Sequence, residues 1–142
     1  MFWRRGGAAG IIEAMSTAYE RLVVDATPAA VVAALRAELQ SRGITEYAVV
    51  DHGHDMAAAG APGHIAWTLV FGNPAAGARL LEREPAAAVD IPLRLAVIAA
   101  DTGAEIVLRD MRSLLSGELG ELAAAFTALL RELAAAARDR VA

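Results

Sequence analysis

The chain has 142 residues, a length that suits a single domain. Its hydrophobic fraction is 56% and 35 of its residues are alanine, which excludes a disordered chain and predicts a core with few large side chains. A formal net charge of −4 argues against a nucleic-acid partner. The absence of lysine excludes Schiff-base chemistry and a phosphate-loop lysine, and the absence of cysteine excludes disulfides and thiolate chemistry.

The first 18 residues are expected to form a flexible N-terminal extension, followed by one α+β domain over residues 19–142. Regular patterning begins just after Met15, which is a plausible alternative start of the protein. The longest uncharged stretch is interrupted by glycine and proline, and its coherent apolar part, Ile65 to Phe71, has the length of a strand. We therefore expect no membrane partner, and the lack of cysteine fits a cytoplasmic location.

Hydrophobic periodicity predicts five strands and three helices in the order β-α-β-β-α-β-β-α. The strands are predicted over residues 19–25, 44–51, 64–72, 93–99 and 104–110. The helices are predicted over residues 28–42, 74–84 and 116–141, and residues 52–63 are predicted to form a loop. This mixture of hairpins and helices is typical of an antiparallel-rich sheet with helices on one face. In the second strand we expect Ile44, Tyr47, Val49 and Val50 in the core.

All three histidines lie close together in the sequence, near the end of the second predicted strand. His52, His54, Asp55 and His64 are the residue types that bind zinc or another divalent metal, so a weak metal site is one hypothesis. The alternative is a solvated polar loop beside a strand end. A third hypothesis is an enzyme in which His52 acts as a base with Asp51, although no nucleophile, metal set or cofactor loop accompanies them.

A second group of candidate residues follows the third predicted strand, in the sequence Phe71-Gly72-Asn73-Pro74. Asn73 before a proline is typical of a helix N-cap, and the free N–H groups of a helix start attract anions. Gly72 allows a ligand or another segment to approach the backbone. The alternative is that Asn73 only caps the helix.

Asp90 lies in an apolar stretch, so its carboxylate is expected to accept backbone N–H bonds or to pair with Arg94 or Arg79. Our first hypothesis is a binding module for a small polar or anionic ligand; no cofactor is firmly implied. Its single pocket at the strand ends is lined by these predicted site residues: Asp51, His52, Gly72, Asn73 and Asp90.

The last predicted helix supports an alternative function. Its apolar stripe is wide enough to leave some surface for a partner after one face has packed on the sheet. A non-catalytic, self-associating module, most simply a homodimer, is therefore the second hypothesis.

The chain from Tyr19 to about Leu115 resembles the domain of unknown function 302 family of bacteria and archaea. The resemblance rests on three stretches: Ala48-Val49-Val50-Asp51-His52, Leu69-Val70-Phe71-Gly72-Asn73-Pro74-Ala75-Ala76-Gly77 and Val89-Asp90-Ile91-Pro92-Leu93. It implies a compact α+β domain that often self-associates and has no established activity. Members with cysteines at the positions of Gly72 and Leu93 imply that these two segments are neighbours in space. Because neither residue is cysteine here, no metal or redox role of those members is expected.

Overall fold

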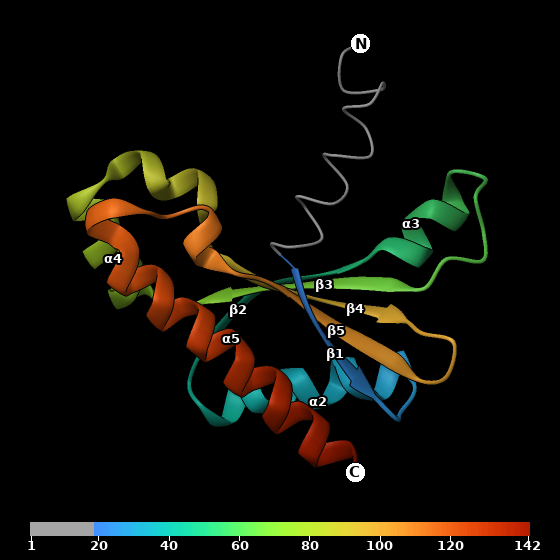
Figure 1. The fold of residues 1–142 in the computed structure, drawn as a ribbon. Helices are drawn as coiled ribbons and strands as arrows, with labels where there is room; N and C mark the ends of the chain where they lie inside the picture. Colours follow the sequence, from blue (N-terminus) through green and yellow to red (C-terminus); the bar gives the residue numbers. More distant parts are fainter. Residues whose placement is uncertain (1–18) are drawn as a thin grey trace, which may run out of the picture.

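The computed structural model describes residues 19–142, so the predicted N-terminal extension lies outside the described residues (Figure 1). Its centre is a five-stranded sheet in the order β1-β5-β4-β3-β2, in which every neighbouring pair is antiparallel. The strands are β1 (Tyr19–Val24), β2 (Thr45–Asp51), β3 (Ala66–Gly72), β4 (Leu93–Ala99) and β5 (Ala104–Arg109). The helices are α2 (Pro28–Ser41), α3 (His52–Ala58), α4 (Pro74–Arg83) and α5 (Gly120–Val141). The predicted α+β class is confirmed.

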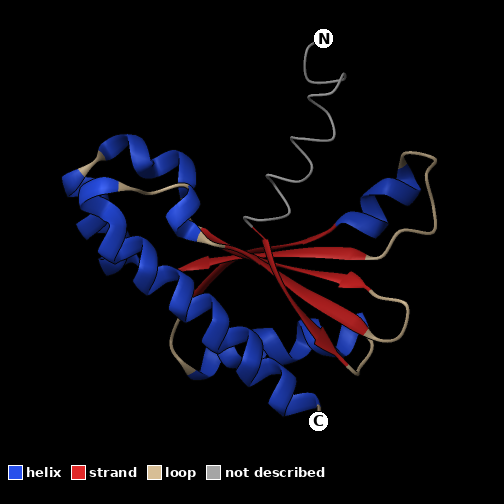
Figure 2. Ribbon diagram, in the orientation of Figure 1, coloured by secondary structure: helices blue, strands red, loops and turns tan. Residues whose placement is uncertain are grey.

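The two long helices α2 and α5 pack against each other and cover the same face of the sheet (Figure 2). Alternate residues of the strands point toward them, as shown by the buried Leu69, Leu95 and Ile106. Within residues 19–142 no helix lies across the opposite face, which carries half-buried residues such as Val107 and Ala96. We call this side the uncovered face.

Helix α2 forms where local signals predict it. Thr27 caps the first turn by accepting a hydrogen bond from the Ala30 amide at 3.2 Å. At the other end Gly43 adopts a positive φ of 65°, a conformation that favours glycine, and its amide donates to the Gln40 carbonyl at 3.1 Å. The next amide, that of Ile44, donates to Leu39 at 3.0 Å, completing a Schellman motif.

Two features of the β2 region differ from the prediction. Residues predicted as a loop begin with helix α3, because the Asp51 side chain accepts a hydrogen bond from the His54 amide and caps a first turn. Tyr47, predicted in the core, is 51% exposed. It lies on an edge strand where the register with β3 shifts between Glu46 and Ala48, so the simple alternation of inward and outward side chains fails there.

The chain between β5 and α5 is tied down by a buried hydroxyl. This segment contains two 3-10 turns, Met111–Ser113 and Gly117–Leu119, so α5 begins four residues later than predicted. Thr127 of α5, only 1% exposed, accepts a hydrogen bond from the Met111 amide at 3.0 Å, and its oxygen lies 2.8 Å from the Ala123 carbonyl. The hydrogen bond between Met111 and Thr127 holds the start of the turn Met111–Ser113 against α5.

None of the helices in residues 19–142 is both long enough and apolar enough to span a membrane. This agrees with the interrupted apolar stretch seen in the sequence.

Candidate functional site

The candidate residues lie at two opposite ends of the sheet. At one end, β3 finishes at Gly72 and β4 begins at Leu93; we call this the cavity end. At the other end, β2 finishes at Asp51 and β3 begins at Ala66; we call this the histidine end. Because β2 and β3 are antiparallel, the partners Asp51–Trp67 and Thr45–Gly72 mark the two ends of one ladder. Trp67 and Gly72 are five residue steps apart along the extended strand, a distance of about 17 Å.

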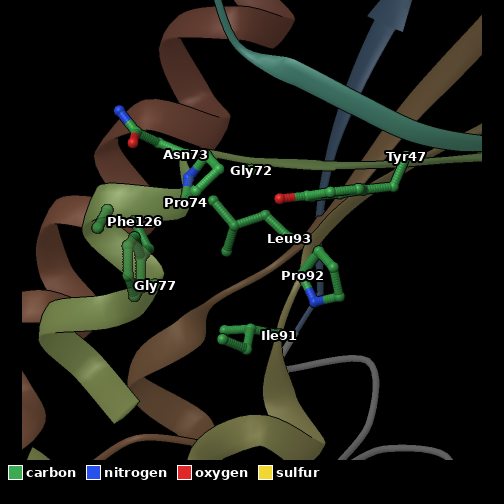
Figure 3. Close-up of a pocket in the computed structure, with 10 residues that line it drawn as sticks. Tyr47, Gly72, Asn73, Pro74, Gly77, Ile91, Pro92, Leu93 and Phe126 are labelled. Atoms are coloured by element: carbon green, nitrogen blue, oxygen red, sulfur yellow. The ribbon is translucent and has the colours of Figure 1, made fainter. Parts of the chain in front are cut away.

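A small cavity of about 80 Å³ opens at the cavity end, and we call it the Tyr47 cavity (Figure 3). The residues that line it come from β2, the β3–α4 junction, the segment before β4, and α5: Tyr47, Gly72, Asn73, Pro74, Ala76, Gly77, Ile91, Pro92, Leu93 and Phe126. Its walls are mostly apolar. The Tyr47 ring extends from β2 with its hydroxyl directed toward Gly72 and Pro74, which gives the cavity one polar group at its rim.

The predicted site residue Gly72 forms part of the wall. A Cβ atom at this position would lie 3.6 Å from Cε2 of Tyr47 and 3.9 Å from Cβ of Pro92, both ordinary contact distances. On the other side of the cavity, a Cβ at Gly77 would lie 3.8 Å from Cδ1 of Ile91. The Asn-Pro turn and the Ile-Pro segment are therefore neighbours, as the family resemblance implied.

Asn73 has the capping role that was the alternative interpretation. Its Oδ1 accepts a hydrogen bond from the Ala75 amide at 2.9 Å, and Pro74 occupies the first position of α4. The side chain points away from the space between Tyr47 and Ile91 (Figure 3). Asn73 therefore lines the cavity with its backbone, and its amide group holds the start of α4 in place.

Asp90 lies beside a second cavity, of about 290 Å³, on the other side of Pro92 and Leu93. We call it the arginine cavity; its lining is Asp90, Pro92, Leu93, Arg94, Arg109, Met111 and Leu114. Within residues 19–142 the Asp90 carboxylate makes no ion pair or side-chain hydrogen bond, so neither Arg94 nor Arg79 is the partner that the sequence suggested.

The remaining two predicted binding residues are at the histidine end. Asp51 caps α3, and Nε2 of His52 lies 2.7 Å from Oγ1 of Thr68 on β3. The five residues predicted to share one pocket are therefore divided among three places: the Tyr47 cavity, the arginine cavity and the histidine end. Only Gly72 and Asn73 line the same cavity.

The predicted metal ligands are not brought together. His54, Asp55 and His64 are exposed, whereas the half-buried His52 ring contacts Thr68. In the part of the chain that the structure describes, no three His, Cys, Asp or Glu side chains are grouped as a metal site would need. The reason is α3: a helix replaces the extended conformation in which alternate residues would share a face.

One carboxylate near the arginine cavity has a strongly perturbed pKa. The Arg112 guanidinium, which donates to Asp110 at 2.6 Å, lowers the pKa of the Asp110 carboxyl to about 2, and the Arg112 backbone amide adds a second hydrogen bond. Asp110 precedes the turn that ends at Ser113, whose hydroxyl donates to the Asp110 carbonyl. Asp110 is thus a structural anion that orders this turn next to Met111.

Sequence reasoning missed four residues of the cavity end: Tyr47, Ile91, Phe126 and Arg109. The sequence predicts Tyr47 in the strand core and gives no sign that Phe126 of the last helix belongs to a site, so neither residue is expected in a cavity wall. The sequence contained one usable signal. Tyr47 lies in a predicted strand rich in charged and small residues, a composition that indicates a strand at the edge of the sheet. The contacts of Tyr47 with Gly72 depend on the strand order, which the sequence alone does not reveal.

Comparisons with known proteins agree with this architecture. The crystal structure of the uncharacterized conserved protein DUF302 from Bacillus stearothermophilus superposes with a TM-score of 0.69 at 17% identity, over 87% of this chain and 97% of that one. At this identity the likeness concerns the fold alone. No curated protein matches the sequence. The family model described as domain of unknown function DUF302 matches residues 20–139, and the chain therefore belongs to this family.

Proposed function

We propose that the protein binds a small molecule at the cavity end, with a short apolar group of the ligand inside the Tyr47 cavity. The observation that carries this proposal is the cavity itself, formed where Gly72, Pro92 and Phe126 meet from three distant segments of the chain. Binding sites are typically concave and mostly apolar, with few polar groups that orient the ligand.

The size of the cavity limits the part of the ligand that enters it. An engineered cavity of about 150 Å³ holds benzene, and the Tyr47 cavity has about 80 Å³. A branched group of three or four carbons fits this space. The polar end of the ligand would lie at the rim, within reach of the Tyr47 hydroxyl and of the Ala76 amide, because Pro74 has no N–H and the Ala75 and Gly77 amides donate to Asn73. The polar ligand expected from the sequence thus becomes an amphipathic one.

The proposal can be tested by titrating ¹⁵N-labelled protein with isobutyramide and isobutanol and following amide chemical shifts. We expect saturable shifts at Gly72, Gly77 and Phe126. Gly72→Ala should weaken binding severalfold, because its methyl group would occupy part of the cavity without overlapping Tyr47. Gly120→Ala is the matched control, since a Cβ there meets no atom within 4 Å and lies outside the cavity lining.

Two results would contradict the proposal. The first is the absence of saturable shifts at the cavity with either probe. The second is equal binding by Gly72→Ala and the native protein, which would place the probes elsewhere. Asn73→Ser provides a further check on the positioning role of Asn73: serine also caps helices, so this variant should bind like the native protein.

Self-association is a second candidate function, and the uncovered face favours it. The last helix, proposed for this role from the sequence, has its widest stripe in the core: Leu130, Leu133 and Ala137 are at most 1% exposed. Half-buried apolar residues remain instead on the uncovered face, among them Val107 and Ala96, which are cross-strand partners. A second copy packed on this face would bury them, and the family resemblance implies this kind of partner.

Light scattering over a range of protein concentrations tests this candidate. A dimer should dissociate in Val107→Lys and persist in the control Val89→Lys, whose residue is 77% exposed outside the sheet. A monomer at every concentration would eliminate the candidate. The cytoplasmic location expected from the absence of cysteine remains a prediction.

A further inference from the structure

The geometry points to a second binding site, in which Arg94 and Arg109 hold the carboxylate of a small monocarboxylic acid and the apolar wall of the arginine cavity holds its body. This site is separate from the Tyr47 cavity, and its two arginines lie on the uncovered face. It is built from residues of β4, β5 and the turn after β5.

The first argument is the register of the two strands. The antiparallel ladder of β4 and β5 ends at the pair Ala96–Val107, and Arg94 and Arg109 lie two residues beyond this pair, where both line the arginine cavity. Both side chains point to the uncovered face, because their neighbours Leu95 and Leu108 are buried on the helix side. Like charges close together on adjacent strands repel each other, so an anion bound by both arginines would remove a repulsion as well as add contacts.

The second argument is that both guanidinium groups retain free donors. Within residues 19–142 neither Arg94 nor Arg109 forms an ion pair, although seven ion pairs connect other residues. Their fork of N–H groups matches the two oxygens of a carboxylate.

The third argument is that one of the two guanidinium groups is already oriented. Arg109 lies over the Tyr19 ring, 4.8 Å from its centroid, and donates to the Tyr19 hydroxyl at 3.1 Å. An oriented donor loses less conformational entropy when the ligand binds.

The charges and walls of the cavity define the ligand class. Two arginines and Asp90 leave a net charge of +1, which a carboxylate neutralises and a phosphate dianion does not. Met111 and the 40% exposed Leu114 provide apolar surface next to the arginines. The volume of about 290 Å³ is close to the lower limit of small-molecule sites, about 300 Å³. A compact aromatic or branched acid fits these conditions.

The test uses benzoate as the probe, with benzamide and inorganic phosphate as comparison compounds, in ¹⁵N NMR titrations at low ionic strength. Benzoate should cause saturable shifts at Arg94, Arg109 and Met111, and added salt should weaken its binding. Benzamide, which has the same shape without the charge, should bind at least tenfold more weakly. Phosphate, which lacks an apolar body, should also bind at least tenfold more weakly.

Variants then identify the residues. Arg94→Gln removes an exposed guanidinium that has no side-chain partner within residues 19–142, and it should weaken benzoate binding at least tenfold. Arg138→Gln is the matched control, because it removes the same charge from an exposed position on α5. Arg109→Lys keeps the charge but loses the fork and should have an intermediate effect.

Three results would overturn the inference. Equal losses in Arg94→Gln and Arg138→Gln would indicate a general charge effect. Phosphate binding as tightly as benzoate would indicate a simple anion patch, and tight benzamide binding would remove the role of the arginines. None of these results bears on the Tyr47 cavity, whose probes are uncharged and whose variant is Gly72→Ala.

Discussion

The two ends of the sheet use their polar residues in opposite ways. At the histidine end, the polar side chains bond to the protein itself: Asp51 caps α3 and His52 contacts Thr68. At the cavity end, two polar groups that line the cavities, the Tyr47 hydroxyl and the Arg94 guanidinium, have no partner among residues 19–142, although the neighbouring Arg109 donates to Tyr19.

The difference shows that a high density of ligand-type residues in one stretch of sequence is a poor guide to a site. Residues 51–55 are close together in the sequence, and the helix that they form gives Asp51 the His54 amide as a partner and leaves the side chains of His54 and Asp55 exposed. The cavity end joins segments from β2, the start of α4, the start of β4 and α5. A concave surface forms where distant segments meet and their side chains do not fill the space completely.

The largest difference in stability between the two ends should appear when one glycine at each end is replaced by alanine. At Gly53 of the histidine end, a Cβ would lie 2.3 Å from the His64 carbonyl oxygen, so Gly53→Ala must displace backbone. We expect it to lower the free energy of unfolding by about 2–3 kcal/mol. Gly72→Ala at the cavity end meets only contacts of 3.6 Å or longer and should cost less than about 1 kcal/mol. Urea denaturation measures both; equal losses would remove this difference between the ends.

The next largest loss of stability should come from removing the buried hydrogen bond between Thr127 and the Met111 amide. Thr127→Val keeps the shape of the side chain but leaves the Met111 amide without its acceptor in a buried position. The free energy of unfolding should fall by about 2 kcal/mol. Thr45→Val, at an exposed position of β2, is the control and should change stability by less than about 0.5 kcal/mol. A neutral Thr127→Val would mean that water reaches the Met111 amide.

A smaller effect should distinguish the two helix caps. Asn73→Ala removes the cap of α4, a helix with a buried Leu80, and should cost about 1 kcal/mol. Asp51→Ala removes the cap of α3, which has no buried residue, and should fray only the first turn of that helix, with a global loss below about 0.5 kcal/mol. Amide hydrogen exchange, measured in α3 and α4 of both variants, distinguishes local fraying of a helix from a loss of global stability. Global destabilisation by Asp51→Ala would contradict this expectation.

The smallest expected effect is a loss of folding stability at low pH, through the protonation of Asp110. The pKa of Asp110 is lowered to about 2 by Arg112, below its ordinary 3.8, so the folded state binds the proton less tightly than the unfolded state. Its stabilisation is complete above about pH 4 and is lost as the pH falls through 3.8 toward 2. We expect roughly 1 kcal/mol after solvent screening. Asp110→Asn should flatten the stability profile in this window, measured by thermal unfolding at each pH; an unchanged slope would assign the loss to other carboxylates.

Much of the fold follows from neighbouring residues in the sequence. Thr27, Pro28 and Gly43 predict both ends of α2, and the predicted bounds of β4 are confirmed. These successes share a physical reason: capping, fixed φ angles and side-chain alternation act within a few residues. The same reasoning predicts Asn73 as a cap, and its hydrogen bond with the Ala75 amide confirms this role.

The candidate sites depend on strand order and register, which couple residues far apart in the chain. The sequence placed Asp51 and Gly72 in one pocket because both follow strands, but the antiparallel pairing of β2 with β3 puts them at opposite ends of the ladder. The same pairing leaves β2 at an edge, where Tyr47 turns from a predicted core residue into a cavity wall. Local chemistry therefore determined the elements and their caps, whereas the long-range ladders decided which side chains meet.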